Sequence, residues 1–149
     1  MKERFETFTV LIAKINRSIR RIKNQEMAEY GLRGTQISCL YYLYAFEELT
    51  ATELCERCEE DKATVSRALE SLEKNGFVVC RSASAKRYKS PLFLTEKGKE
   101  VGKRICGKID CVLDEVSIGV SEEERASLYR VLSAISDHLE AVTSSYAEF

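Results

Sequence analysis

Apolar residues near the start of the chain recur at alternating steps of three and four, which predicts a long helix over residues 2 to about 29. The seam consists of Phe5, Phe8, Ile12, Ile15, Ile19 and Ile22. Such a narrow stripe is typical of a helix that pairs with another helix. Because one small domain does not need a first helix of this length, we expect a partner helix. Gly31 and Gly34 follow and should break it.

Residues 35–47 are apolar on nearly all sides, which predicts a second helix that is buried on several faces. Its tyrosines each combine an apolar ring with a polar tip, so they either pack in the core or line a pocket for a small molecule. Packing is the favoured interpretation. For the basic residues on the opposite face of the first helix, exposure to solvent is the favoured interpretation, and anion binding is the alternative. The candidate ligand-binding residues are Arg17, Tyr41 and Tyr44.

Two short helices come next. Thr50 and Glu53 have the spacing of a capping box, and the helix that they open should end near Cys58. Asp61 should cap the following helix, which extends to residue 75, with Gly76 as its C′ residue. The buried stripe of that helix is Val65, Ala68, Leu69 and Leu72.

A small hairpin should follow, with strands over residues 77–81 and 88–94 and a tip over residues 82–87. Pro91 cannot donate to a strand ladder, so it must occupy an edge or a bulge. Thr95 begins a further helix that ends at Gly119, and Ser121 with Glu124 forms a second capping box that opens the last helix.

This order of elements is that of a winged helix-turn-helix: mainly α, with a small β-hairpin wing. We expect a single domain over residues 1–149. Residues 35–95 form the winged helix-turn-helix, residues 95–118 form a connecting helix, and residues 1–34 and 119–149 form N- and C-terminal dimerisation helices.

Local charge indicates a polyanion partner. The chain carries a net charge of −1, but residues 61–91 hold seven basic and three acidic residues, a net +4 that leaves −5 on the remainder. Small and basic side chains at the N-terminus of the second short helix suit a DNA major groove, and the basic hairpin suits phosphates or a minor groove. A hairpin that is basic by chance is the less favoured alternative. The candidate DNA-binding residues are Lys62, Ala63, Thr64, Ser66, Arg67, Lys86, Arg87 and Lys89.

Other classes of function fit poorly. The sequence shows no catalytic constellation and no Gly-rich phosphate loop, so we expect neither an enzyme nor a cofactor. No apolar run is long enough for a bilayer, and the charged N-terminus does not resemble a signal peptide, so we expect a cytoplasmic protein with no membrane partner.

Six cysteines leave one alternative open. Cys55 and Cys58 form a pair spaced i, i+3, but no second pair follows to complete a metal site, so no metal ligands are expected. Cys106 and Cys111 should face different sides of one helix. Buried structural thiols are the favoured interpretation, and a thiol- or metal-responsive regulator that uses these cysteines is the alternative.

The motifs LTATELCERCEEDKATVSRALESLEKNGFV (residues 49–78) and LTEKG (residues 94–98) carry a resemblance to a known family. They resemble the multiple antibiotic resistance regulator (MarR) family of bacterial transcription factors over essentially the whole chain. The resemblance implies a homodimeric regulator, by our interpretation a repressor, that binds a pseudo-palindromic double-stranded operator. It also implies release by a small phenolic or anionic effector. By position it assigns the recognition contacts to residues 62–64, 66 and 67, and the wing arginine to Arg87.

Two residues depart from the family pattern. Lys86 stands where the family wing often has an Asp that steadies the arginine, so we expect wing contacts that are more purely electrostatic. Arg33 replaces the usual capping Thr before the second helix, so Thr35 or a backbone group must cap it.

Overall fold

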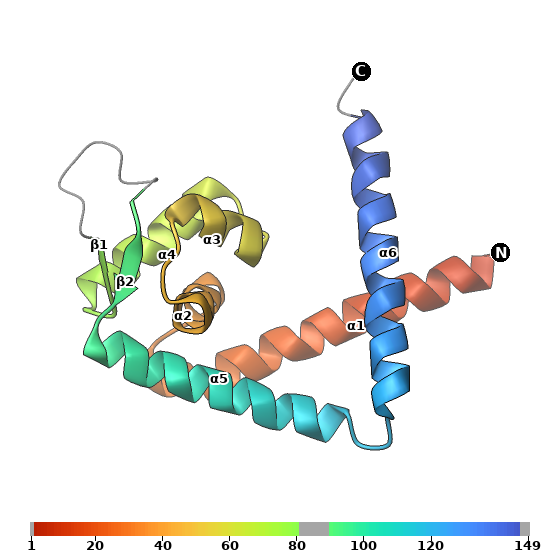
Figure 1. Ribbon diagram of the computed structural model, residues 1–149, viewed down its shortest axis with the longest axis horizontal. Helices are drawn as coiled ribbons and strands as arrows, with labels where there is room; N and C mark the ends of the chain where they lie inside the picture. The colour runs from red at the N-terminus through yellow and green to blue at the C-terminus, as the bar shows by residue number, and fades with distance from the viewer. Residues whose placement is uncertain (1, 81–89, 147–149) are drawn as a thin grey trace. The chain divides into compact units, whose positions relative to one another are not determined.

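The structure, a computed structural model, describes residues 2–80 and 90–146, with side chains from residue 7. Figure 1 shows a mainly helical chain with one small antiparallel hairpin, which confirms the predicted fold class. The elements are α1 (Lys2–Glu26), η1 (Ala28–Tyr30), α2 (Thr35–Phe46), α3 (Ala51–Cys58), α4 (Lys62–Lys74), β1 (Val78–Cys80), β2 (Leu92–Leu94), α5 (Glu96–Val116) and α6 (Glu122–Tyr146). The chain divides into two compact units, residues 1–110 and 111–149.

The core of the first unit is built around α2, which packs against α3, α4 and β2. Ile37, Cys39, Leu40 and Leu43 of this helix are buried, as its apolar sequence predicts. The predicted stripe of α4 is buried as well, together with Leu54 and Leu49. A helix of eight residues such as α3 is too short to be stable alone, so this packing must stabilise it.

Helix ends follow the predicted capping residues. The Glu53 N–H donates to the Thr50 hydroxyl at 3.3 Å, and the Thr50 N–H donates to the Glu53 carboxylate at 2.7 Å. Asp61 caps α4 by accepting from the Thr64 N–H at 2.9 Å. Gly76 follows that helix with a φ of +73°, a backbone conformation that residues with a Cβ rarely adopt.

The start of α2 is capped differently from the prediction for Thr35. The hydroxyl of Thr35 donates to Glu60 instead, and Gly34 occupies the N-cap position with a φ of +48°. The Gln36 N–H donates to the Arg33 carbonyl at 3.1 Å, so a backbone group does serve, as the alternative predicted. The Gln36 side chain in turn accepts from the Arg33 N–H at 3.1 Å.

Several predicted element ends shift by one to four residues. The first helix ends at Glu26, three residues early, and continues as the 3-10 turn η1, because Gly31 with a φ of +64° closes the turn onto the Ala28 carbonyl. The first strand begins at Val78, one residue late. The second begins at Leu92, immediately after Pro91, because proline has no N–H to give to the ladder.

The two strands pair antiparallel, with Val78 opposite Leu94 and Cys80 opposite Leu92. The N–H of Leu92 also donates to the carbonyl of Leu49 at 2.9 Å, so the segment between α2 and α3 lies on the edge of the hairpin. The predicted tip, residues 82–87, lies outside the described residues.

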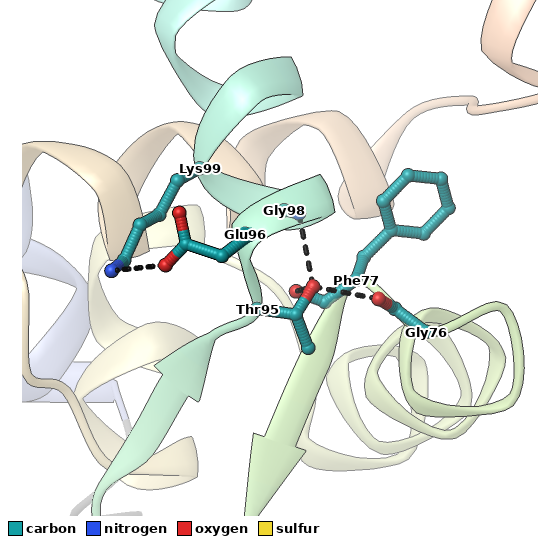
Figure 2. Close-up of polar contacts among 6 residues, drawn as sticks. All are labelled: Gly76, Phe77, Thr95, Glu96, Gly98 and Lys99. Atoms are coloured by element: carbon teal, nitrogen blue, oxygen red, sulfur yellow. Dashed lines mark hydrogen bonds and ion pairs between the residues drawn. The ribbon is translucent and has the colours of Figure 1, made fainter.

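Thr95 joins the end of β2 to the turn that follows α4 (Figure 2). Its Oγ1 lies 2.7 Å from the carbonyl oxygen of Gly76 and accepts from the N–H of Gly98 at 3.0 Å, which caps α5. Its own N–H donates to the carbonyl of Phe77 at 3.1 Å. One residue therefore fixes the start of α5 against the end of α4.

Gly98 makes this close approach possible. A Cβ at this position would lie 2.0 Å from the Phe77 carbonyl oxygen, and one at Gly102 would lie 2.8 Å from Cβ of Tyr44. The two glycines are one helical turn apart, so α5 presents a bare stripe to its neighbours. The spacing of the LTEKG motif thus has a steric reason.

The second unit contains the end of α5 and the long helix α6. Ser121 and Glu124 form the predicted capping box, with the Glu124 N–H donating to the Ser121 hydroxyl at 3.2 Å. Gly119 has a φ of +80° in the turn after α5, which ends at Val116. None of the described residues of α6 is buried. The assignment of residues 1–34 and 119–149 to dimerisation stays a prediction.

We expect Gly98→Ala to destabilise the protein by about 1–3 kcal/mol, because its methyl group would overlap a backbone carbonyl that cannot rotate away. Urea denaturation followed by circular dichroism measures the change. Gly107→Ala is the matched control, since nothing lies within 4 Å of its Cβ position in the same helix. It should stabilise the protein by about 0.5–1 kcal/mol through helix propensity. Equal effects of the two substitutions would contradict the steric argument.

Candidate nucleic-acid interface

The candidate reading edge comprises Lys62, Ala63, Thr64, Ser66 and Arg67, all in the first two turns of α4. Lys62, Ala63 and Arg67 are exposed, and Thr64 and Ser66 are partly exposed. The opposite face of the helix is held in the core by its four buried apolar residues. The helix can therefore present this edge without changing its packing.

A short chain of hydrogen bonds orders the edge. The Thr64 hydroxyl donates to the second carboxylate oxygen of Asp61 at 2.7 Å. The Arg67 guanidinium donates to the same hydroxyl oxygen at 3.3 Å. Because a hydroxyl has one hydrogen and two lone pairs, Thr64 can serve both partners at once. Asp61 thus caps the helix and, through Thr64, orients Arg67.

The charge state of Asp61 favours this arrangement. Hydrogen bonds from the Thr64 hydroxyl and the Thr64 N–H hold the pKa of the Asp61 carboxyl below its usual value, and the charge of Arg67 lowers it further. The carboxylate is therefore ionised at neutral pH and remains an acceptor for both donors. The bond to Thr64 uses one of the five N–H donors of the guanidinium, and a bidentate contact to a guanine edge needs two.

Ser66 contributes a second polar contact on this edge. Its hydroxyl lies 3.4 Å from a carboxylate oxygen of Glu70, one turn further along the helix. The small side chains of Ala63 and Ser66 let the backbone of α4 come close to a base pair, which a larger residue would prevent.

The wing candidates Lys86, Arg87 and Lys89 lie outside the described residues, so their contacts stay predictions. The two strands that lead to and from the wing are described, and they are joined to α4 through Gly76, Phe77 and Thr95. The base of the wing is therefore fixed relative to the reading edge.

The three ligand-binding candidates are not among the residues that line the cleft beside η1. Arg17 is exposed on α1, Tyr41 meets the ring of Tyr42 edge-on at 5.1 Å, and Tyr44 is half-buried against Gly102. A cleft of about 310 Å³ lies elsewhere, between the end of α1 and the start of α2. It is lined by Asn24, Ala28, Gly31, Leu32 and Arg33. The sequence pattern marks Gly31 only as a helix breaker and Arg33 only as a departure from the family's capping residue, so it does not point to this cleft.

Cysteine positions divide by burial. Cys39 is fully buried in the core, and Cys55, Cys58 and Cys80 are partly buried against it. Cys106 is partly buried on α5, and Cys111 is exposed. Among the residues that the structure describes, no group of three or more His, Cys, Asp or Glu side chains is arranged to hold a metal ion.

Helices α2, α3 and α4 form a core, a two-stranded hairpin follows them, and α4 carries an exposed polar edge. These features define the class of winged helix-turn-helix DNA-binding proteins. The MarR family profile matches residues 30–87. The HTH-type transcriptional regulator YwoH of Bacillus subtilis is 33% identical over 93 residues, which cover 60% of this chain and 68% of YwoH. The chain belongs to the MarR family, and it is a DNA-binding transcriptional regulator and not an enzyme.

Solved structures agree with this assignment. A putative MarR family regulator from Listeria monocytogenes, in complex with a 26mer DNA, superposes with a TM-score of 0.76 at 26% identity, covering 86% of this chain and 85% of that one. Staphylococcus aureus MarR, in complex with salicylate and kanamycin, shares the fold, with a TM-score of 0.76 at 18% identity over 93% of this chain and 97% of that one. Over the described part of the chain, no helix has the length and apolar character needed to cross a bilayer.

We expect Arg67→Ala to weaken binding to a DNA fragment from upstream of the protein's own gene by about 1–3 kcal/mol, because a base contact would be lost. Fluorescence anisotropy at fixed salt measures this change. Arg67→Lys should recover little of the loss, since an ammonium cannot make the bidentate contact. Lys74→Ala removes the same charge from the far end of α4 and serves as the control. An equal loss in Arg67→Ala and Lys74→Ala would show that Arg67 acts only through its charge.

Proposed function

We propose that this protein is a sequence-specific, homodimeric repressor in the cytoplasm, which leaves its pseudo-palindromic operator when a small phenolic or anionic molecule binds. The observation that carries the DNA-reading part is the ordered edge of α4. There, Asp61 and Thr64 hold Arg67 at the N-terminus of a well-packed helix. Ordering this arginine before binding lowers the entropy that is lost on contact with DNA.

Exposed apolar residues on the two long helices support the homodimer. Ile15 of α1 is 53% exposed and Tyr146 of α6 is 73% exposed within a single chain. Large apolar side chains recur along both helices at helical spacing, and a monomer would leave them in water. Those above 40% exposure are Val10, Leu11, Ile12, Ile15 and Ile19 on α1, and Leu128, Tyr129, Val131, Leu139, Val142 and Tyr146 on α6.

Two copies would allow a chain with a net charge of −1 to bind DNA tightly. Each copy offers roughly four basic groups at its reading edge and wing, so a dimer should neutralise about six to eight phosphates. The logarithm of the affinity should then fall with the logarithm of salt concentration with a slope of roughly −5 to −7. The acidic remainder of each chain should keep binding confined to one end of the molecule.

For the effector, we propose Arg17 as the partner of an anionic group, and Tyr41 and Tyr44 as the residues that contact an aromatic ring. The salicylate in the S. aureus relative supports this chemical class, since salicylate combines a carboxylate with a phenol. The half-buried tyrosines of α2 lie on the helix around which the core is built, so a ligand there would act on the packing of α3 and α4.

We expect Ile15→Glu to convert the dimer to a monomer, because a carboxylate in the apolar seam of α1 would lose its hydration on pairing. Sedimentation equilibrium should give twice the chain mass of 17.0 kDa for the wild type and the chain mass for the variant. Ala13→Glu adds the same charge on another face of α1 and should remain dimeric. A monomeric wild type would contradict the proposal.

Salicylate should release the wild-type protein from its upstream DNA, and Arg17→Ala should need at least about tenfold more salicylate for the same release, because the ion pair is lost. Titration of the protein–DNA complex with salicylate measures both. Arg21→Ala removes an arginine from the same helix as a control. Release that is unaffected by Arg17→Ala would exclude this site, and no release at all would exclude this class of effector.

A further inference from the structure

The start of α2 is held against the reading helix α4 at two points. The Thr35 hydroxyl donates to a carboxylate oxygen of Glu60 at 3.4 Å, and Glu60 directly precedes Asp61, the N-cap of α4. The side-chain amide of Gln36 donates to the Ser71 hydroxyl of α4 at 2.8 Å. The segment that leads into α2 therefore has a fixed place beside α4 and beside the turn that caps it.

Arg33 belongs to this segment, and its backbone is hydrogen-bonded on both sides. Its N–H donates to the Gln36 side chain at 3.1 Å, and its carbonyl accepts from the Gln36 N–H at 3.1 Å. The next N–H, that of Gly34, donates to the side-chain carbonyl of Asn24 on α1 at 3.3 Å. Because Gln36 also bonds Ser71, the backbone of Arg33 is fixed relative to the reading helix.

The side chain of Arg33 is exposed on this fixed backbone. Within residues 7–80 and 90–146, no hydrogen bond or ion pair engages its guanidinium. Its backbone groups serve the start of α2, and its side chain does not. A guanidinium carries a permanent charge and five donors in a planar fork that matches the oxygens of a phosphate. The fold therefore leaves these donors available to an anionic partner.

The neighbouring turn needs a basic group if it is to approach DNA. Glu59, Glu60 and Asp61 are three consecutive exposed acidic residues in front of the reading edge, and their charges repel phosphates. The major groove is about 12 Å wide, with a phosphate backbone along each edge. A helix that enters the groove by its N-terminus brings the residues beside that end close to one of these backbones. Arg33 is the basic residue that the start of α2 offers there.

We propose that Arg33 binds a phosphate of the DNA backbone beside the major groove that α4 enters. A phosphate contact supplies affinity and sets the register of the protein on the duplex, but it carries no sequence information. Arg33 stands where the family usually has a Thr, so the charged contact distinguishes this chain from relatives that keep the Thr. That the contact occurs twice in each complex rests on the homodimer proposed above.

The first test is the salt dependence of DNA binding by the full-length protein. Fluorescence anisotropy with the upstream DNA should show at least about fivefold weaker binding for Arg33→Ala. The slope of log affinity against log salt should become flatter by about two, since each phosphate contact contributes about 0.9 and a dimer makes two. Arg33→Lys should keep most of the slope, because an ammonium also pairs with a phosphate. Arg21→Ala removes an exposed arginine from α1 and should change neither value.

An unrelated DNA fragment of the same length separates a phosphate contact from a base contact. Arg33→Ala should weaken binding to both fragments by a similar factor, whereas Arg67→Ala should weaken binding mainly to the upstream fragment. Ethylation interference then locates the contact on the upstream fragment. Ethylation of one phosphate in each half-site should weaken the wild type and have no effect on Arg33→Ala.

Three results would overturn the proposal. The first is a salt slope that Arg33→Ala leaves unchanged, even if affinity falls, because the residue would then act only on the structure. The others are a loss confined to the upstream fragment and an ethylation pattern that is the same for both proteins. Equal melting temperatures by circular dichroism should show that the substitution leaves the fold intact. Failure of the wild type to bind the upstream fragment would instead reject the proposed operator, and the unrelated fragment would still decide whether Arg33 contacts a phosphate.

Discussion

The contact between Gly98 and the Phe77 carbonyl is the constraint on which the arrangement of α4, the hairpin and α5 depends. A Cβ at Gly98 would lie 2.0 Å from that oxygen, so α5 can reach the turn after α4 only through a glycine. Thr95 then bonds the same turn through its hydroxyl and its N–H (Figure 2). This contact therefore joins three parts of the fold. They are the end of α4, the passage from β2 into α5, and the base of the wing. Because the reading edge lies on the same helix α4, its position relative to the wing and α5 is fixed by this contact.

Local signals predicted the elements well, because each depends on residues close in sequence. Capping by Thr50 and Asp61 and the left-handed turn at Gly76 need only neighbours within a few positions, and the structure has all three. Where a distant partner decides, the sequence left two alternatives open. The Thr35 hydroxyl donates to Glu60, which lies between α3 and α4, and does not cap α2. Nothing in the local sequence points to that partner.

The candidate site shows the same division. Sequence reasoning selected the residues of the reading edge from their exposed helical spacing, and the structure gives them that exposure. It did not find the order within the edge. The sequence presents Asp61 as a cap and Arg67 as a base reader, and only the geometry makes Thr64 the acceptor that joins them. Likewise, the sequence drew attention to Cys55 with Cys58, whereas helix packing buries Cys39 in the core against which both of them are packed.

A signal can change DNA affinity only if it favours one arrangement of the reading edge over another. Most of α4 is a poor place for such a change, because its buried stripe is fixed in the core. Its N-terminal cap is different. Asp61 is joined to the end of α3 through Glu59 and Glu60, which are both exposed. A displacement of this turn would act on the cap and leave the core packing of α4 in place. The turn that orders Arg67 for DNA is thus a point at which a small displacement would disorder it.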